Sequence, residues 1–474
     1  MKKKIMTLLL VAAMAFTAIG CGKDASAKVS NKYTTVTEAM DWGPAITKLV
    51  LNVGANVDPS SLNENSYKVS SRRQYVGLDW TTFETGDQDV ITERTVTKAY
   101  VSDEKGNEDA SGSYVTLEME VGPDKVEGSP FNYDFEKGVN TYVETSYIVE
   151  PTDGAKIVDT AGKEVKFSLD GKSTGANINV LADDFDLTGT YTENKQTLCY
   201  ASYVPANVGG EGSTPLIIWL HGAGEGGTDP TIDIMGNKVV NLATEDIQQF
   251  FGETGAEILA PQSPTMWMDD GTGQYLSPEG ANGRSVYTDT LMGLIKNYVA
   301  EHKEIDSKRI YIGGCSNGGY MTINMLAEFP GYFAAAYPVC EAYSVNWLDD
   351  AKIANLAQTP MWLTAAKNDS TVPIYKGNIG PDYTTYYLEY DENGENIPVD
   401  DFTLGLHTRL EAAGNTNLHM TIFDDVHDTT GKYFLTGSTN PYQYQGHWSW
   451  IYVLNNEVEE ESQTIFQWLS EQSL

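Results

Sequence analysis

The stretch RIYIGGCSNGGYMTINMLA, residues 309–327, is the most informative part of the sequence for the fold. Its first residues, 310–313, have the apolar character of a buried strand, and a helical pattern begins near residue 319. The motif G-x-S-x-G occupies residues 314–318 between them. A strand, a tight glycine turn and a helix in this order expose the central serine above a sheet. Ser316 is therefore the predicted nucleophile, and the N–H of Asn317 is a predicted oxyanion donor.

A second glycine-rich loop lies upstream, directly after another buried strand. Residues 220–227 of this loop read LHGAGEGG. Glycines at such a turn let backbone N–H groups approach a substrate carbonyl, so Ala223 is the predicted second oxyanion donor and Gly224 the alternative. No lysine follows the glycines, which excludes a phosphate-binding loop. His221 and Glu225 are expected to hold the loop in shape.

The acid and the base are expected to follow the serine along the chain. The apolar strand expected over 361–366 leads to Asp369, within the sequence DSTVP, so Asp369 is the predicted acid that orients a histidine. Of the six histidines, two precede the serine, one lies in an expected helix and one in an expected strand. His427 and His447 remain as candidates for the base. Position soon after the last strand favours His427.

The two parts of the chain have different hydrophobic patterns. Residues 184–474 alternate continuous apolar runs with helical patterns such as 285–302, which predicts an α/β-hydrolase domain with a doubly wound, mostly parallel sheet. Residues 41–183 instead contain short runs of alternating polar and apolar residues, such as 46–53, 90–101 and 114–121. Polar turns separate these runs, and the pattern predicts an all-β sandwich.

Several motifs resemble those of one family in particular. They are DWGPAITK at 41–48, LHGAGE at 220–225, APQ at 260–262, FAAAYPVC at 333–340 and G-H-x-x-W at 446–450. The sequence resembles the α/β-hydrolase esterases with an N-terminal Ig-like domain, a prolyl-oligopeptidase-like group also known as predicted peptidases. The resemblance implies that the sandwich is Ig-like and that His447, in the G-H-x-x-W motif, is the base rather than His427. The sequence departs from the family in having Gly226 where arginine is usual, which leaves the partner of Glu225 open.

The first residues have the features of an export signal. Three lysines at positions 2–4 precede an apolar run over 5–19, and the small residues before Cys21 resemble a bacterial lipobox. We therefore expect residues 1–21 to be a lipoprotein signal peptide, Cys21 to carry the lipid, and residues 22–40 to form a tether. The expected location is the outer face of a bacterial membrane. Ordinary signal cleavage near residues 25–27 is the alternative.

Charge and composition limit the classes of function. The chain has 66 acidic and 31 basic residues, a net charge of -35, which makes nucleic-acid binding implausible. Cys199, Cys315 and Cys340 remain, and three cysteines form no disulfide framework. Cys315 and Cys340 are expected to be buried thiols, with a disulfide between them as the alternative. No spacing of cysteine and histidine suggests a metal site.

The expected activity is hydrolysis of carboxylic esters through an acyl-enzyme, without metal or cofactor. Small-molecule or carbohydrate esters are the expected substrates, and Trp267, Trp448 and Trp450 are candidates for lining an acyl pocket, although such residues more often belong to a core. The alternatives are a serine peptidase of the prolyl oligopeptidase type and a surface lipoprotein that only binds. A missing member of the Ser-Asp-His set would favour the last alternative, and none is missing.

Overall fold

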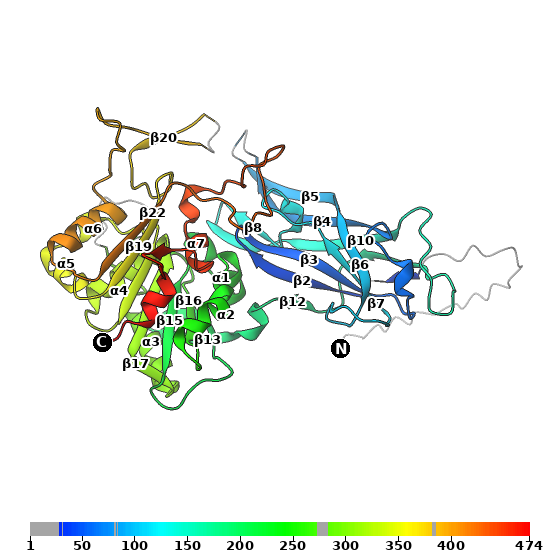
Figure 1. The fold of residues 1–474 in the computed structure, drawn as a ribbon, viewed down its shortest axis with the longest axis horizontal. Helices are drawn as coiled ribbons and strands as arrows, with labels where there is room; N and C mark the ends of the chain where they lie inside the picture. The colour runs from blue at the N-terminus through cyan, green and yellow to red at the C-terminus, as the bar shows by residue number, and fades with distance from the viewer. Residues whose placement is uncertain (1–27, 31, 80–81, 83, 273–282, 382–384) are drawn as a thin grey trace, which may run out of the picture.

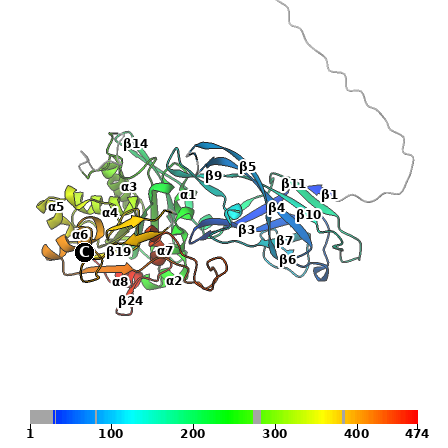
Figure 2. The ribbon, with the colours of Figure 1, turned by 90° about the horizontal axis from the view of Figure 1, so that it is seen from above.

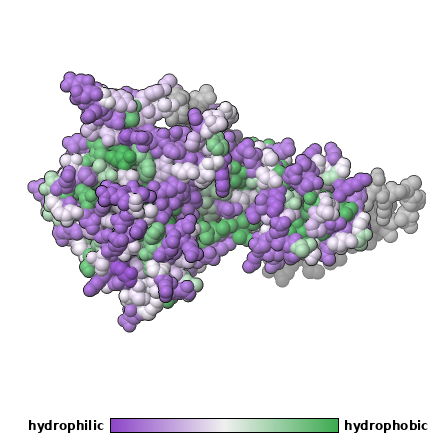
Figure 3. All heavy atoms as spheres, viewed as in Figure 1, coloured by the Kyte–Doolittle hydropathy of each residue, from purple (hydrophilic) through white to green (hydrophobic). Residues whose placement is uncertain are grey.

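The computed structural model describes residues 28–30, 32–79, 82, 84–272, 283–381 and 385–474. Two domains lie end to end along the long axis of the molecule, with the sandwich at one end and the C-terminal domain at the other (Figures 1 and 2). The expected signal peptide and Cys21 lie outside the described residues. Every helix within the described ranges is too short or too polar to cross a membrane. Hydrophilic residues cover most of the face drawn in Figure 3, in agreement with the high net charge.

The N-terminal domain is a sandwich of two five-stranded sheets. One has the order β1(Lys28–Ser30), β11(Phe167–Gly171), β10(Glu144–Pro151), β4(Tyr67–Leu78), β5(Thr85–Arg94). The other has the order β12(Asn177–Asn179), β2(Tyr33–Met40), β3(Gly43–Asn52), β7(Tyr114–Met119), β6(Val96–Ser102). Apolar side chains of both inner faces, among them Leu49, Val69, Leu117 and Phe167, form one core between the sheets. The alternating pattern of the sequence thus produces the predicted sandwich.

Two expectations for this domain are wrong. The expected tether extended to residue 40, but Tyr33–Met40 form β2, which pairs antiparallel with β3 and contributes Tyr33 to the core. The run 90–101 was expected as one strand, but it divides into β5 and β6, which belong to different sheets. The chain crosses between the sheets at residue 95, and the buried Arg94 side chain donates there to the carbonyls of Ile46 and Glu120.

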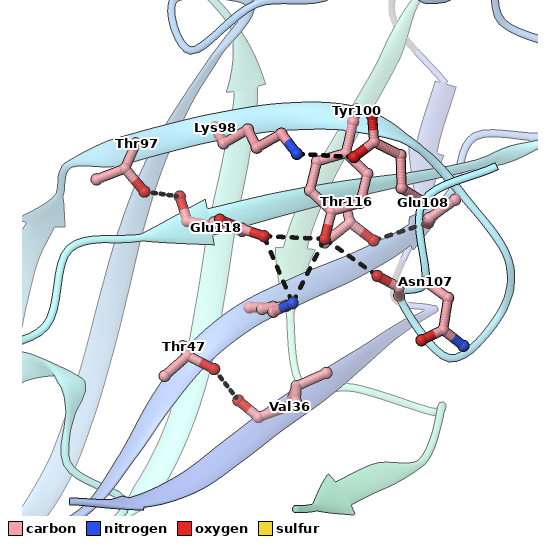
Figure 4. A network of polar contacts seen from close by, with 12 residues as sticks. Val36, Thr47, Thr97, Lys98, Tyr100, Asn107, Glu108, Thr116 and Glu118 are labelled. Carbon is pink, nitrogen blue, oxygen red and sulfur yellow. Dashed lines mark hydrogen bonds and ion pairs between the residues drawn. The ribbon is translucent and has the colours of Figure 1, made fainter. Parts of the chain in front are cut away.

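Polar contacts fix the loops of the sandwich, and one network is drawn in Figure 4. The Tyr100 hydroxyl lies 3.0 Å from both the Gly106 carbonyl and the Glu118 carboxylate, and Lys98 pairs with Glu108 at 2.8 Å. A further hairpin, β8(Phe131–Asp134) with β9(Val139–Tyr142), lies at the boundary with the second domain (Figure 1). That position brings the hairpin into contact with the second domain's glycine loop.

The C-terminal domain has an eight-stranded, mostly parallel sheet. In spatial order its strands are β13(Asp186–Glu193), β14(Gln196–Tyr203), β16(Glu257–Gln262), β15(Thr214–Leu220), β17(Ile305–Cys315), β18(Ala335–Val339), β19(Met361–Ala366) and β22(Leu418–Phe423). The pairs β13–β14 and β14–β16 are antiparallel, and the others are parallel. The sheet therefore has the predicted doubly wound α/β-hydrolase architecture.

Helices cover both faces of this sheet. On one face α1(Pro230–Gly236), α2(Glu245–Gln248), α7(Trp450–Leu454) and α8(Ile465–Ser470) pack on one core cluster. On the other face α3(Thr288–Glu301), α4(Asn317–Glu328), α5(Asp350–Leu356) and α6(Phe402–Ala412) pack on a second cluster. Successive residues of β15 alternate between the two clusters, as expected for a strand covered on both sides. Small hairpins, β20(Gly377–Ile379) with β21(Tyr386–Leu388) and β23(Glu459–Glu460) with β24(Gln463–Thr464), lie outside the sheet.

Candidate active site

Ser316 lies at the abrupt turn between β17 and α4. Its backbone has φ 54° and ψ -112°, a conformation that non-glycine residues seldom adopt. The turn is held because the Ser316 N–H donates to the Val339 carbonyl at 2.9 Å and the Tyr320 N–H donates to the Ser316 carbonyl at 2.9 Å. The serine side chain thus leaves the sheet at the carboxyl end of β17, where α/β proteins form their sites.

The glycines around the serine are required by close packing. A Cβ atom at Gly314 or at Gly318 would collide with the backbone carbonyl oxygen of Leu220, the last residue of β15. A Cβ atom at Gly319 would lie 2.7 Å from the Cα of Glu341. The G-x-S-x-G pattern therefore reflects how tightly the turn packs between β15 and the end of β18.

His447 is paired with Asp369 beside this turn. The His447 Nδ1 lies 2.7 Å from Oδ2 of Asp369, and both side chains are buried. The other carboxylate oxygen of Asp369 accepts the N–H groups of Thr371 at 2.8 Å and Val372 at 2.9 Å. The carboxylate is thereby fixed by the loop after β19, and it fixes the imidazole in turn.

The position of His447 depends on the glycine that precedes it. A Cβ atom at Gly446 would lie 2.5 Å from the carbonyl carbon of Asn368, so only glycine lets the short helix η8(Gly446–Trp448) approach the Asp369 loop. Burial disfavours the charged imidazolium, but contacts with Cys340 and Asp369 outweigh it and raise the pKa of His447 well above its usual value. Cys340 is a second neighbour of this histidine that the sequence did not reveal.

The other candidate histidines have different surroundings. His427, the alternative base, contacts the Asp425 carboxylate at 2.5 Å and the Tyr452 hydroxyl at 3.3 Å, and its side chain is 41% exposed. His221 is fully buried, and its Nε2 accepts the N–H of Ser263 at 3.0 Å. Burial lowers the pKa of His221 to about 4, so this imidazole is neutral and holds the glycine loop in shape, as expected.

The glycine loop carries Ala223 and Gly224 in the short helix η4(Ala223–Glu225). Ala223 and Gly224 face the same cavity as Ser316. Asn317 is the first residue of α4, and its side-chain oxygen accepts the N–H of Trp267 at 2.5 Å. The backbone donors expected from the sequence thus belong to elements that converge on the serine.

Glu225 finds its partner in the other domain. Its Oε1 accepts a hydrogen bond from Nδ2 of Asn140, on β9 of the N-terminal domain, at 3.0 Å. A Cβ atom at Gly226 would collide with the Thr265 carbonyl oxygen, so the loop as folded here accommodates only glycine at this position. Burial raises the pKa of Glu225 to about 7, and that of the neighbouring Asp233 well above its usual value. Residue 140 was not predictable, because the only signal was the missing arginine.

The serine opens into a cavity of about 670 Å³ between the two domains, which we call the active-site cavity. Aromatic residues from both domains line it: Trp42, Tyr133 and Phe135 from the sandwich, and Trp448 and Trp450 from the second domain. Trp450 lies 5.7 Å from the His447 ring in an edge-on arrangement. Trp267 is instead fully buried against His221 and Tyr287, so it belongs to the core and not to a pocket.

Cysteines and clusters of possible metal ligands among the described residues were the other candidates for chemistry. Cys199, Cys315 and Cys340 are free thiols, so the alternative disulfide is not formed. One group of possible metal ligands occurs within the described ranges, Glu257, His302 and Glu304, with ligand atoms within 4.8 Å of one another. It lies where β16 and β17 begin, whereas Ser316 follows the end of β17.

Comparisons with known proteins agree with this architecture. A family model described as "Esterase Ig-like N-terminal domain" matches residues 32–166, and one described as "Prolyl oligopeptidase family" matches residues 273–378. The crystal structure of a thermostable esterase is 24% identical with a TM-score of 0.68, and the match covers 94% of this chain and all of that one. None of the curated proteins compared with the chain matches it.

Two further solved structures match more weakly. An acylaminoacyl peptidase from Pyrococcus horikoshii is 16% identical (TM-score 0.33, covering 51% of this chain and 38% of that one). A ferulic acid esterase is 13% identical (TM-score 0.35, covering 51% of this chain and 90% of that one). Neither supports an argument about substrate. The family models and the fold agree, and the chain is a serine hydrolase of the α/β-hydrolase fold with an esterase-type Ig-like N-terminal domain.

Proposed function

We propose that the chain is a serine esterase in which Ser316, His447 and Asp369 act as nucleophile, base and orienting acid. The observation that carries the proposal is the 2.7 Å contact between His447 and Asp369, with His447 and Ser316 lining one cavity. A carboxylate that fixes Nδ1 leaves Nε2 free to take the serine proton. His427, which contacts Asp425 instead, is a bystander in this assignment.

The proposed reaction is acyl transfer in two steps. His447 takes the Ser316 proton while Oγ attacks the acyl carbon, and the resulting oxyanion accepts the N–H groups of Asn317 and Ala223. The tetrahedral intermediate collapses, His447 returns the proton to the leaving alcohol, and the acyl group remains on Oγ. Water, deprotonated by His447, then attacks the acyl-enzyme and releases the carboxylic acid and free Ser316. Gly224 is the alternative donor in the glycine loop.

Ester substrates, either small-molecule or carbohydrate esters, are part of the proposal. The family model that matches residues 32–166 is that of an esterase N-terminal domain, and this domain supplies three of the aromatic residues of the active-site cavity. A cavity of about 670 Å³ is of the size that holds a small ligand. The competing activity is amide hydrolysis, because the other family model is that of prolyl oligopeptidases.

The test compares Ser316→Ala with the unmodified chain on p-nitrophenyl acetate and on p-nitroacetanilide, the matching amide. We expect a loss of about 10⁴-fold or more in kcat with the ester, with an unchanged melting temperature. The unmodified chain should hydrolyse the ester at least about 10³-fold faster than the amide, because the amine is a far poorer leaving group. Full activity of Ser316→Ala would remove the serine from the mechanism, and comparable amide turnover would favour a peptidase.

We further propose that the chain is exported and anchored by lipid at Cys21. The support is the basic start, the apolar run over 5–19 and the small residues before the cysteine. Expression in a bacterium supplied with an alkyne-tagged fatty acid should label the protein, and Cys21→Ser should abolish the label. A labelled Cys21→Ser variant, or an unlabelled parent that is exported and cleaved near residues 25–27, would refute the anchor.

A further inference from the structure

A second cavity, of about 380 Å³, adjoins the active-site cavity, and four residues line both: Trp42, Tyr133, Gln445 and Trp448. Its other walls come from β4, from the segment 122–132 of the sandwich, and from residues 442–444 of the second domain. We propose that this cavity, the side cavity, binds a sugar unit bearing a carboxylate, the alcohol part of the ester substrate. The proposal rests on the proposed esterase function, because the sugar unit is the leaving group of that reaction.

The charge of the side cavity differs from that of the whole chain. Among the described residues that line it are two cations, Arg73 and Lys125, and no aspartate or glutamate. The chain as a whole has 66 acidic and 31 basic residues. Lys125 has a carboxylate partner, Glu120 at 3.6 Å, so Arg73 is the group that sets the preference for an anion.

Arg73 is a buried cation that forms no ion pair with any described carboxylate. The residue is 6% exposed, its Nη2 donates to the Phe131 carbonyl at 3.2 Å, and its guanidinium lies 5.0 Å from the centre of the Tyr75 ring. Its Nε is buried without a hydrogen-bond partner in the described structure. A buried guanidinium is normally paired, because an unpaired one is costly to desolvate. A carboxylate in the side cavity would supply the missing partner in the bidentate geometry that arginine favours.

The preceding arginine on the same strand shows the contrast. Arg72 faces the other side of β4, is about half exposed, and pairs with Asp89 through Nε at 2.7 Å and through Nη2. The strand therefore carries a paired arginine outward and an unpaired one inward toward the side cavity. The outward residue provides a matched control for the inward one.

The remaining walls suit a ring with many hydroxyl groups. Aromatic rings line the side cavity on several sides, with Tyr444 stacked on Trp448 at 6.1 Å and tilted against Tyr442 at 5.3 Å. The Tyr444 side chain is 4% exposed, and its hydroxyl has no hydrogen-bond partner in the part of the chain that the structure describes. The amides of Gln443 and Gln445 offer further donors and acceptors. Aromatic faces with hydroxyl and amide groups match a sugar better than they match a simple carboxylate.

The arrangement of the two cavities suggests how one substrate would use both. The walls shared through Trp42 and Trp448 place the side cavity next to the space that Ser316 faces. A sugar bound in the side cavity would direct its acylated hydroxyl toward Ser316. The sandwich would thus contribute to the choice of alcohol, because β4 belongs to that domain.

The test measures kcat/KM for two monoacetylated methyl glycosides, one of glucuronate and one of glucose, which differ only in the carboxylate at C6. The full chain should prefer the glucuronate ester by about tenfold or more. Arg73→Gln should bring the ratio near one, Arg73→Lys should keep part of it, and Arg72→Gln should leave it unchanged. Because the net charge of the chain is -35, nonspecific electrostatic repulsion would instead favour the uncharged glucose ester.

A binding measurement keeps the two proposals separate. Calorimetry with Ser316→Ala and glucuronate or glucose measures the side cavity without turnover, and we expect binding of glucuronate to be tighter by a similar factor. The anionic site would be overturned by equal kcat/KM values for the two glycosides in the unmodified chain, or by an equal loss of preference in the Arg73 and Arg72 variants. Activity on p-nitrophenyl acetate would still uphold the esterase. If Ser316→Ala keeps its activity but binds glucuronate, the esterase mechanism fails and the site stands. If Arg73→Gln does not fold, the substrate pair and the calorimetry still decide.

Discussion

The hydrogen bond between Asn140 and Glu225 predicts that the Ig-like domain affects the rate of hydrolysis. Replacing Asn140 with alanine removes the 3.0 Å contact that joins β9 to the glycine loop of the second domain. This loop carries Ala223 and Gly224, the proposed oxyanion donors. Loss of one such donor costs about 10²–10³ in rate, and a loosened loop should cost less. We expect kcat on p-nitrophenyl acetate to fall about tenfold, with a smaller change in KM.

The same substitution should have an effect on stability that depends on pH. Burial raises the pKa of Glu225 from 4.5 to about 7, so the folded chain binds its proton more tightly than the unfolded chain does. Stability therefore decreases as pH rises between about 4.5 and 7, by about 3 kcal/mol for this group. The Asn140 amide opposes the shift because it stabilises the carboxylate. Asn140→Ala should thus cost about 1 kcal/mol at pH 5.5 and about 2 kcal/mol at pH 8.5, where the lost bond is to a charged group.

The assay combines steady-state kinetics with calorimetric melting at the two pH values. Thr141→Ala is the matched control, because the hydroxyl of this neighbour on β9 donates to the Asn132 carbonyl within its own hairpin. It should leave kcat unchanged and lower the melting temperature equally at both pH values. The reasoning fails if Asn140→Ala and Thr141→Ala have the same kinetics, or if the loss of stability in Asn140→Ala does not grow with pH.

Three further predictions concern the base and its surroundings. His447→Ala should lower kcat by about 10⁴-fold or more while His427→Ala changes it less than about threefold, as measured with p-nitrophenyl acetate; the reverse order would make His427 the base. Because the pKa of His447 is raised, the rise of kcat/KM with pH should have its midpoint above 6.5, and Asp369→Asn should move this midpoint to lower pH. An unmoved midpoint would show that Asp369 does not set the pKa of the base. Gly446→Ala should push η8 away from Asn368 and lower kcat about 10²-fold at nearly constant KM, whereas an active variant would show that the glycine is dispensable.

The C-terminal domain was largely predictable because its strands are buried on both faces. The expected strand at 361–366 coincides with β19, and the elbow around Ser316 has the expected strand and helix on its two sides. Short exposed elements were less predictable. The run 90–101 divides between two sheets, and near the C-terminus residues 459–464 form the small hairpin β23–β24 before α8.

The candidate site was predictable only where one local motif carries the chemistry. Position along the chain favoured His427, and only the resemblance of the G-H-x-x-W motif favoured His447. The physical reason for that motif, the close approach of Gly446 to Asn368, depends on contacts between segments that are far apart in the sequence. Asn140 carries no local signal, and the FAAAYPVC motif does not reveal that Cys340 contacts His447, because each acquires its role from a neighbour on another element.

The DWGPAITK motif connects these observations. Asp41 lies in the turn between β2 and β3, and its buried carboxylate accepts from Lys238 at 2.8 Å and from Asn455 at 3.2 Å, both in the second domain. The next residue, Trp42, lines both cavities. A motif that resembled a domain opening in the sequence is thus a docking contact in the structure. Asp41 and Asn140 both bond to the second domain, and both line the active-site cavity together with the aromatic residues. Asp41, Trp42 and Asn140 all lie where the sandwich meets the second domain, so movement of the sandwich should change both the glycine loop and the walls of the active-site cavity.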